Sequence, residues 1–177
     1  MTYTQHYDSP LGGILLAADD VGLTGLWFDR QKYFARGLSN ERIEQETSVL
    51  AEAKRWLDIY FTGKAPDFTP PLHPIGSAFR RSVWEILLQI PYGQTATYGE
   101  IARQLAKKQG LDRMSAQAVG GAVGHNEISI IIPCHRVVGA DGSLTGYAGG
   151  IDKKEKLLEL ERADMSRFFV PKNGNAL

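Results

Sequence analysis

The sequence predicts an α/β (α+β) protein of two small domains, and three observations carry this prediction. The chain has 177 residues, a length that fits one domain or two small ones. Residues 3–28 read as short strands with turn residues between them, whereas apolar residues three and four apart dominate the later part. Four of the eight prolines fall between Pro66 and Pro74, where neither a helix nor a central strand can continue. We therefore expect an N-terminal domain over 1–74, including this linker, and a C-terminal domain over 75–177.

The N-terminal domain is expected to be a small antiparallel sheet with one helix. Three strand-like segments are separated by SPLGG and DDVG, which have the composition of turns. From Thr47 or Ser48, apolar residues recur at helical spacing as far as Phe61, and Gly63 follows where a helix would end.

The C-terminal domain is expected to be mostly helical and to contain a helix-turn-helix motif. Ser77 is the expected N-cap of a first helix, which Pro91 stops. Thr97-Tyr98-Gly99-Glu100 has the capping-box pattern and begins a second helix, and a short third helix follows over 115–124. Two short helices joined by a turn that contains glycine have the spacing of a helix-turn-helix.

The last part of the chain predicts a strand, a loop and a final helix. The apolar, β-branched run at 128–132 predicts a buried strand, which Pro133 ends. A glycine-rich loop at 146–150 leads into a helix that Asp152 and Glu155 are expected to cap.

The composition excludes several classes of protein. Hydrophobic residues make up 43% and charged residues 23% of the chain, which is typical of a globular protein and not of a disordered or fibrous one. No apolar run approaches the ~20 residues of a membrane span, and the N-terminus lacks the basic and apolar segments of a signal peptide. We expect a cytoplasmic monomer without a membrane partner.

Cys134 is the only cysteine, which excludes an intrachain disulfide and a zinc site built from several cysteines. The four histidines are scattered, so we expect no metal and no cofactor. A lone cysteine is most often a small buried residue. Its neighbours favour a reactive thiol instead, because Pro133 precedes it, His135 and Arg136 follow it, and a glycine-rich loop lies downstream.

The helix expected at 115–124 has almost no side-chain bulk. Three of its residues are glycines, and each costs ~1 kcal/mol relative to alanine inside a helix. Such a surface lets another backbone approach closely, which fits both tight packing inside the protein and a groove of DNA. The formal net charge is zero for the whole chain but +3 over 71–177, a weak indication of contact with phosphates.

The run Pro133-Cys134-His135-Arg136-Val137 resembles the active-site motif of the O6-alkylguanine-DNA alkyltransferases, the methylated-DNA-protein-cysteine methyltransferases. The resemblance covers about residues 77–162, and separated matches follow in the family's order. These matches are Tyr98, Ala-Val-Gly-Gly-Ala at 118–122, Asn126, Tyr147-Ala148-Gly149-Gly150 and Glu161. The N-terminal half fits the family only by size and coarse pattern.

The resemblance implies DNA repair by direct, stoichiometric and irreversible transfer of an alkyl group from O6-alkylguanine to Cys134. O4-alkylthymine is a second candidate substrate. His135 would then be the base that activates the thiol through a bridging water, and Glu161 would orient His135. Asn126 would brace the active-site turn, and Tyr98 would hydrogen-bond the guanine.

The resemblance also implies which residues hold the base and the DNA. The backbone N–H of Ala148 would face O6, and the carbonyls of Cys134 and Val137 would accept from the exocyclic amine, with Tyr147 and Gly149 in the same pocket. Because a duplex hides O6 in the base stack, the base is expected to be flipped out while the thin helix enters the minor groove of double-stranded DNA. The expected DNA-binding residues are Ser115, Ala116, Gln117, Ala118, Gly120, Gly121 and Arg136.

Gln117 departs from the family's pattern, because better-known members carry an arginine there that fills the gap left by the flipped base. Glutamine can hydrogen-bond to bases but stacks less well and has no charge. We expect Gln117 to fill the same gap.

Two other functions remain open at the level of the sequence. One is a non-enzymatic helix-turn-helix protein that binds damaged DNA, and the other is a Cys-His-Glu hydrolase. Cys134 argues against the first, and the lack of a G-x-S-x-G-like nucleophile elbow argues against the second.

Overall fold

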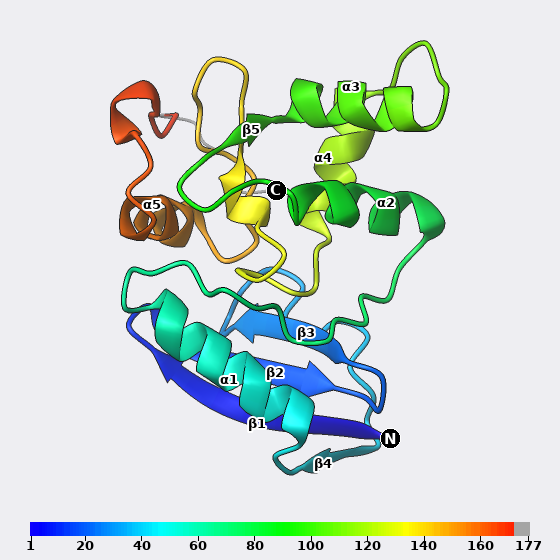
Figure 1. The fold of residues 1–177 in the computed structure, drawn as a ribbon, viewed down its shortest axis with the longest axis vertical. Coiled ribbons are helices and arrows are strands. Elements are labelled where there is room, and N and C mark those ends of the chain that lie inside the picture. The colour runs from blue at the N-terminus through cyan, green and yellow to red at the C-terminus, as the bar shows by residue number, and fades with distance from the viewer. Residues whose placement is uncertain (172–177) are drawn as a thin grey trace. The chain divides into compact units, whose positions relative to one another are not determined.

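The chain forms two compact units in a computed structural model that describes residues 1–171 (Figure 1). The first unit comprises Met1–Ile75 together with Glu127–Ile131, and the second comprises Gly76–Asn126 and the chain from Ile132 onward. The sequence does not indicate that five residues of the second half return to the first unit. The last six residues of the expected C-terminal domain lie outside the described residues. No described helix is long and apolar enough to cross a membrane.

The first unit is a four-stranded sheet with one helix packed on it (Figure 1). Its elements are β1 (Thr2–Ser9), β2 (Gly12–Ala18), β3 (Leu23–Phe28), β4 (Arg42–Glu44) and α1 (Ser48–Tyr60). β1, β2 and β3 are antiparallel neighbours, as expected, and α1 contacts all three. β4 lies parallel to β1 at the other edge, and the sequence does not predict it because all three of its residues are exposed.

Glu127–Ile131 lies beside β3 without forming a strand. The backbone N–H of Leu26 donates to the carbonyl of Glu127 at 2.8 Å, and that of Ser129 donates to the carbonyl of Leu26 at 3.1 Å. These two hydrogen bonds form a single isolated bridge and do not extend into a ladder of paired residues. The strand expected over 128–132 is therefore wrong.

Two tight turns take the place of that strand. Hydrogen bonds between the flanking residues close three-residue turns around Ile130, with φ of 69°, and around Pro133, with φ of −82° and ψ of 65°. A left-handed φ is rare for a β-branched residue, so local sequence preference cannot indicate it. The second turn delivers the chain to Cys134, which begins a 3₁₀ turn and not an extended segment.

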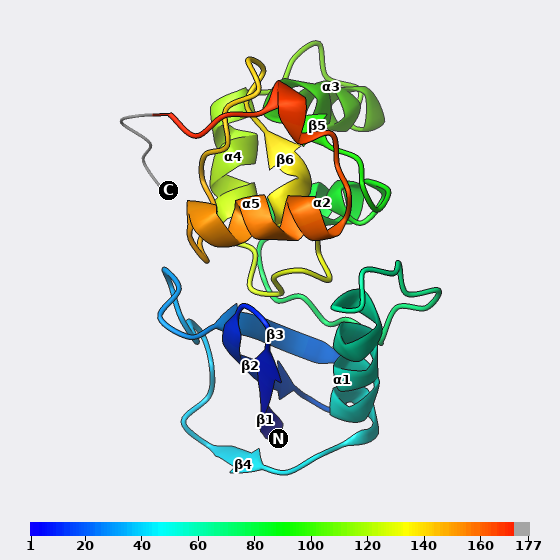
Figure 2. The same cartoon turned by 90° about the vertical axis from the view of Figure 1, so that its left-hand side faces the viewer.

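Helices make up most of the second unit (Figure 2). They are α2 (Ala78–Leu87), α3 (Tyr98–Lys108), α4 (Ala116–Gly124), α5 (Ile151–Leu160) and the 3₁₀ turns η1 (Cys134–Arg136) and η2 (Met165–Arg167). The hydroxyls of Ser77, Thr97 and Ser115 cap α2, α3 and α4 by accepting a backbone N–H three residues on. β5 (Ala96–Thr97) pairs in parallel with β6 (Val137–Val138).

α4 is the centre of the helical packing, because both α2 and α3 lie against it. Its Val119, Ala122 and Val123 are buried, and the indole N–H of Trp84 on α2 donates to the carbonyl of Ala122 at 2.9 Å. The expected helix-turn-helix is thus formed by α3 and α4. α5 begins after Gly150 without a side-chain cap, so the cap expected from the acidic residues of its first turns is absent.

Candidate active site

Cys134 lies at the start of η1, and the residue is 7% exposed. The amide nitrogen of Asn126 donates to Sγ at 3.3 Å and to the carbonyl of Ile132 at 2.9 Å. Asn126 therefore holds both the sulfur and the turn that carries it. Burial raises the pKa of the Cys134 thiol, and the hydrogen bond from Asn126 opposes this effect. A thiol in this state needs a base in order to become a nucleophile.

The carboxylate of Glu161, at the end of α5, accepts hydrogen bonds from two side chains and from the backbone. They come from His135 Nε2 at 2.6 Å, from Arg136 Nε and Nη2 at 2.8 and 3.0 Å, and from the backbone N–H of Gly93 at 3.1 Å. Burial alone would raise the pKa of Glu161, but His135 and Arg136 outweigh it and hold the pKa well below its ordinary value. Glu161 is therefore a permanent anion next to the histidine.

His135 presents one free ring nitrogen inside the protein. Its ring is fully buried, and Nδ1 has no hydrogen-bond partner within residues 1–171. Burial lowers the pKa of His135, with Glu161 opposing the shift, so the resting imidazole is neutral. The Nε2–H then donates to Glu161, which leaves a lone pair on Nδ1 that can accept a proton. The structure places the expected histidine and glutamate in direct contact.

We expected Arg136 among the DNA-binding residues, but the structure shows its donors turned to groups inside the protein. Its side chain is buried, and besides the two bonds to Glu161 its Nη1 donates to the carbonyl of Ile90 at 2.7 Å. The guanidinium also lies over the ring of Tyr92, 5.8 Å from the centroid. An arginine can be buried only when its fixed fork of donors is matched, and here the carboxylate matches it. The role of Arg136 is corrected to that of a buried countercharge for Glu161.

The residues expected in the base pocket lie around β6 and the loop before α5. Tyr98 begins α3, and its hydroxyl donates to the carbonyl of Thr145 at 3.3 Å. The ring of Tyr147 is buried and stands edge-on to that of His135, with centroids 6.4 Å apart. Ala148 and Gly149 follow and are half-buried.

Lys154 is a residue of this site that the sequence does not reveal. It is fully buried, and its Nζ donates to the carbonyls of Val137 and Thr145. A lysine on an amphipathic helix is normally read as exposed, and only its position directly in line with the apolar residues Leu157 and Leu158 of α5 could have signalled burial.

α4 divides its small residues between an open and a packed face. Its exposed residues and its cap are Ser115, Ala116, Gln117, Ala118 and Gly121. A Cβ at Gly121 would meet nothing within 4 Å, whereas one at Gly120 would lie 3.8 Å from the ring of Tyr98. The DNA contact expected from Gly120 is therefore wrong, because this glycine faces the protein interior. A Cβ at Gly120 would make an ordinary van der Waals contact with the ring of Tyr98, whereas open space surrounds Gly121.

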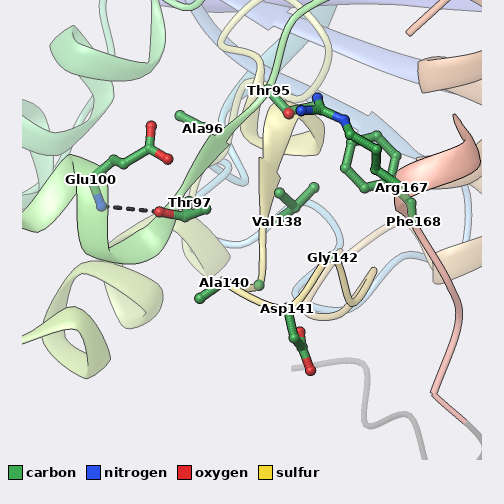
Figure 3. A pocket seen from close by; sticks show the side chains of 11 residues that line it. Thr95, Ala96, Thr97, Glu100, Val138, Ala140, Asp141, Gly142, Arg167 and Phe168 are labelled. Carbon is green, nitrogen blue, oxygen red and sulfur yellow. Dashed lines mark hydrogen bonds between the residues drawn. The ribbon is translucent and has the colours of Figure 1, made fainter. Parts of the chain in front are cut away.

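Two hollows flank the helix-turn-helix, and neither is lined by Cys134. The first, of about 330 Å³, lies between β5, Val138 and the turn at 139–142, with Arg167 and Phe168 on its far wall (Figure 3). The second, of about 510 Å³, is lined by α3 and by the connection to α4. Three of its lining residues are the exposed cations Arg103, Lys107 and Arg113.

Two family models match the chain. The model described as "6-O-methylguanine DNA methyltransferase, DNA binding domain" matches residues 78–163, and the one described as "6-O-methylguanine DNA methyltransferase, ribonuclease-like domain" matches residues 2–74. Together they cover most of both units.

The chain belongs to the 6-O-methylguanine DNA methyltransferase family. A methylated-DNA–protein-cysteine methyltransferase of Methanosarcina acetivorans is 45% identical over 159 residues, which is 90% of this chain and 97% of that protein. One from Mycobacterium tuberculosis is 42% identical over 95% of this chain and 99% of its own length. The resemblance read from the sequence is thus confirmed for the family.

Solved structures of methyltransferases agree with this membership. A crystal structure of the M. tuberculosis O6-methylguanine methyltransferase matches with a TM-score of 0.77 and 42% identity, over 98% of this chain and 97% of that one. A structure of the M. tuberculosis protein in complex with DNA also has a TM-score of 0.77, over 94% of each chain. These matches favour neither the non-enzymatic binding protein nor the hydrolase.

Replacing Glu161 by Gln in this methyltransferase should lower the free energy of unfolding by about 3–5 kcal/mol at pH 7, because Arg136 would keep a buried charge without its partner. The folded pKa of Glu161 lies below its unfolded value of about 4.3, so its stabilisation is complete above that pH and is lost as the pH falls further. Urea unfolding at pH 7 and at about pH 3 measures the difference. Glu159→Gln, on the exposed side of α5, is the control. A difference between wild type and Glu161→Gln that stays constant with pH would contradict the assignment.

The two central glycines of α4 should respond differently to leucine. Gly121→Leu should weaken binding to duplex DNA while leaving the free energy of unfolding unchanged or up to ~1 kcal/mol higher, because the helix loses a glycine at an open position. Gly120→Leu should destabilise the fold, because the side chain would meet the ring of Tyr98. Urea unfolding and fluorescence anisotropy with labelled duplex measure both effects. Wild-type DNA affinity in Gly121→Leu would show that the open face of α4 is not the DNA face.

Proposed function

We propose that this chain repairs DNA by moving the alkyl group of O6-alkylguanine onto its own Cys134, once per molecule. One observation carries the proposal: the only thiol of the chain is followed directly in sequence by a buried histidine whose Nδ1 has no hydrogen-bond partner within residues 1–171. Asn126 fixes the sulfur, and Glu161 fixes the imidazole. Membership of the 6-O-methylguanine DNA methyltransferase family supports the same reaction.

Formation of the thiolate is the first requirement. Residues on a 3₁₀ turn are about 120° apart around its axis, so the side chains of Cys134 and His135 point in different directions. We assign the proton transfer to one bridging water that carries the thiol proton to Nδ1. The imidazolium that results is stabilised by the carboxylate of Glu161, 2.6 Å from Nε2.

The thiolate then displaces guanine from the alkyl carbon. An S–C bond forms, the C–O6 bond breaks, and its electron pair leaves with the guanine, which finally takes up the proton that the thiol released. The backbone N–H of Ala148 and the hydroxyl of Tyr98 are the donors that we assign to the guanine anion. Burial, followed by the charge of Cys134, raises the pKa of Tyr98 to about 12, which keeps its hydroxyl protonated as a donor.

The remaining pocket contacts are assigned to Val137, Tyr147 and Gly149, with the carbonyls of Cys134 and Val137 accepting from the exocyclic amine. The thioether product is inert to the groups of this site, so each molecule acts once.

Access to O6 requires that the nucleotide leave the duplex, at a cost of a few kcal/mol. The open face of α4 carries only small residues and Gln117, which suits close approach in the minor groove. α4 has no charged side chain, so we assign phosphate contacts to the hollow beside it, where Arg103, Lys107 and Arg113 form no ion pair within residues 1–171.

We also place the protein in the cytoplasm and expect it to act as a monomer. The nucleophile must stay a reduced thiol, which a reducing compartment ensures. A single chain contains every residue to which the reaction is assigned.

Replacing Cys134 by Ser should abolish alkyl transfer while folding and DNA binding stay close to wild type. The hydroxyl is nearly isosteric with the thiol but hardly ionises at neutral pH. Intact-mass measurement after incubation with methylated duplex should show one added methyl group per wild-type chain and none on the variant. Transfer by the serine variant, or more than one equivalent of repaired base per wild-type chain, would contradict the mechanism.

Replacing Gln117 by Ala should slow the repair of duplex DNA but hardly change the reaction with free O6-benzylguanine, because only the duplex reaction must hold a base out of the stack. Gln117→Arg should restore or raise the duplex rate, since a guanidinium plane stacks on bases and reaches phosphates. Second-order rate constants on both substrates decide the matter. Equal losses on both would place Gln117 in the pocket or in the fold.

A further inference from the structure

Lys154 carries a buried charge that the reaction described so far does not use. It lies on α5 with no exposed surface, and no carboxylate within residues 1–171 forms an ion pair with it. Its Nζ donates to the carbonyls of Val137 at 2.6 Å and of Thr145 at 2.7 Å. An ammonium without a countercharge is costly to bury. Its presence in the core therefore indicates that it interacts with an anion at some stage of the reaction.

One of the two carbonyls that hold Lys154 belongs to Val137, whose backbone N–H donates to the carbonyl of Cys134. Val137 directly follows η1, the turn that begins with Cys134, and α5 packs against that turn. The carbonyl of Thr145 also accepts the hydroxyl of Tyr98. The ammonium is thereby fixed at two points between the active-site turn and the loop that precedes α5.

Three titratable groups on neighbouring elements interact with this ammonium or share its acceptors. They are Cys134 and His135 on η1 and Tyr98 on α3. None of them is a permanent anion: the histidine is neutral at rest, and burial raises the pKa of Tyr98 to about 12. Of these three groups, only Cys134 becomes negative during the proposed reaction. The anion with which Lys154 interacts is therefore the thiolate.

We propose that Lys154 is a positioning residue for alkyl transfer, whose ammonium, clamped by the carbonyls of Val137 and Thr145, is the countercharge against which Cys134 ionises. The role of Lys154 in repair rests on the proposed function. The thiol proton moves to His135, the negative charge stays on sulfur, where the ammonium balances it, and the charge on sulfur disappears when the S–C bond forms. Lys154 itself gives up no proton in this sequence.

The electrostatics agree with this geometry. Burial lowers the pKa of Lys154 to about 8, with the charge of Cys134 opposing the shift, so the ammonium is mostly charged at neutral pH. The same ammonium opposes the rise that burial causes in the pKa of the thiol. It also disfavours a charged His135, a cost that Glu161 offsets.

The test is the pH dependence of thiolate reactivity in Lys154→Met, a neutral side chain of similar length. Because Cys134 is the only cysteine, the rate of its reaction with iodoacetamide reports this thiolate alone and needs neither DNA nor alkylguanine. We expect the midpoint of the rate profile to rise by about one pH unit or more, because an opposite charge at close range shifts a pKa by roughly 1–3 units. At pH 7 the reaction with iodoacetamide and the repair of methylated duplex should both slow by about tenfold for each unit. An unchanged midpoint would overturn the proposal.

Lys156→Met is the matched control, because Lys156 is an exposed lysine on the same helix. It removes the same formal charge and should leave the midpoint in place. An equal rise in both variants would overturn the proposal by showing an effect of net charge. Because the iodoacetamide profile does not depend on repair, it decides the role of Lys154 even if the chain fails to transfer alkyl groups from DNA.

A reciprocal measurement leaves Lys154 in place, in case Lys154→Met does not fold. Coupling between two charges acts equally on both, so removing the thiolate should lower the pKa of the lysine. We expect the ¹⁵N NMR titration of the Lys154 amine to have a lower midpoint in Cys134→Ser than in wild type. Identical midpoints would overturn the proposal.

Discussion

The carboxylate of Glu161 is the group on which the rest of the active site depends. It accepts from His135 and Arg136, which are neighbours on η1, and from the backbone of Gly93, which precedes β5. One side chain at the end of α5 therefore fixes the turn that carries the nucleophile. The same bonds set its chemistry, because the fixed negative charge keeps Nε2 of His135 as the donor and leaves a lone pair on Nδ1, the atom that we propose as the base.

The balance of buried charge explains how a weakly acidic thiol can react at neutral pH. Arg136 and Lys154 bring two positive charges into the interior, and Glu161 brings one negative charge. Arg136 neutralises the carboxylate by direct contact, which leaves the ammonium of Lys154 for an anion that forms only during the reaction. Ionisation of Cys134 thus completes a charge distribution that is already built into the fold, and Asn126 adds a hydrogen-bond donor at the sulfur.

On the side of the second unit that we propose to face DNA, the small residues and the positive charges lie on different elements. α4 offers small side chains and a capped N-terminus, with no ionic group of its own. Cations stand instead on α3 and on the connection to α4. This division suits a protein that must search DNA with little regard to sequence, because phosphate contacts carry no sequence information and a smooth helix does not select among base edges.

Local patterns in the sequence determined much of the fold. Hydroxyl caps at Ser77 and Thr97 and apolar residues at helical spacing were sufficient to place α2 and α3, because capping and amphipathicity act within a few residues. The short turn-separated strands of the N-terminal sheet followed for the same reason. β4 did not, because its exposed residues show no alternation. The cap of α4 at Ser115 was shown by the structure.

For the site, the sequence determined which residues belong to it but not how they contact one another. The succession Cys134-His135-Arg136 and the family's separated matches named the residues that we propose as nucleophile and base, together with Glu161. Only the tertiary structure showed that Arg136 is buried against Glu161, that Gly120 packs on Tyr98, and that Lys154 lies inside. It also replaced the strand expected at 128–132 by turns around Ile130 and Pro133. The physical reason is common to all of these: burial, a left-handed φ and the choice of an ionic partner depend on groups distant in sequence, and no local preference encodes them.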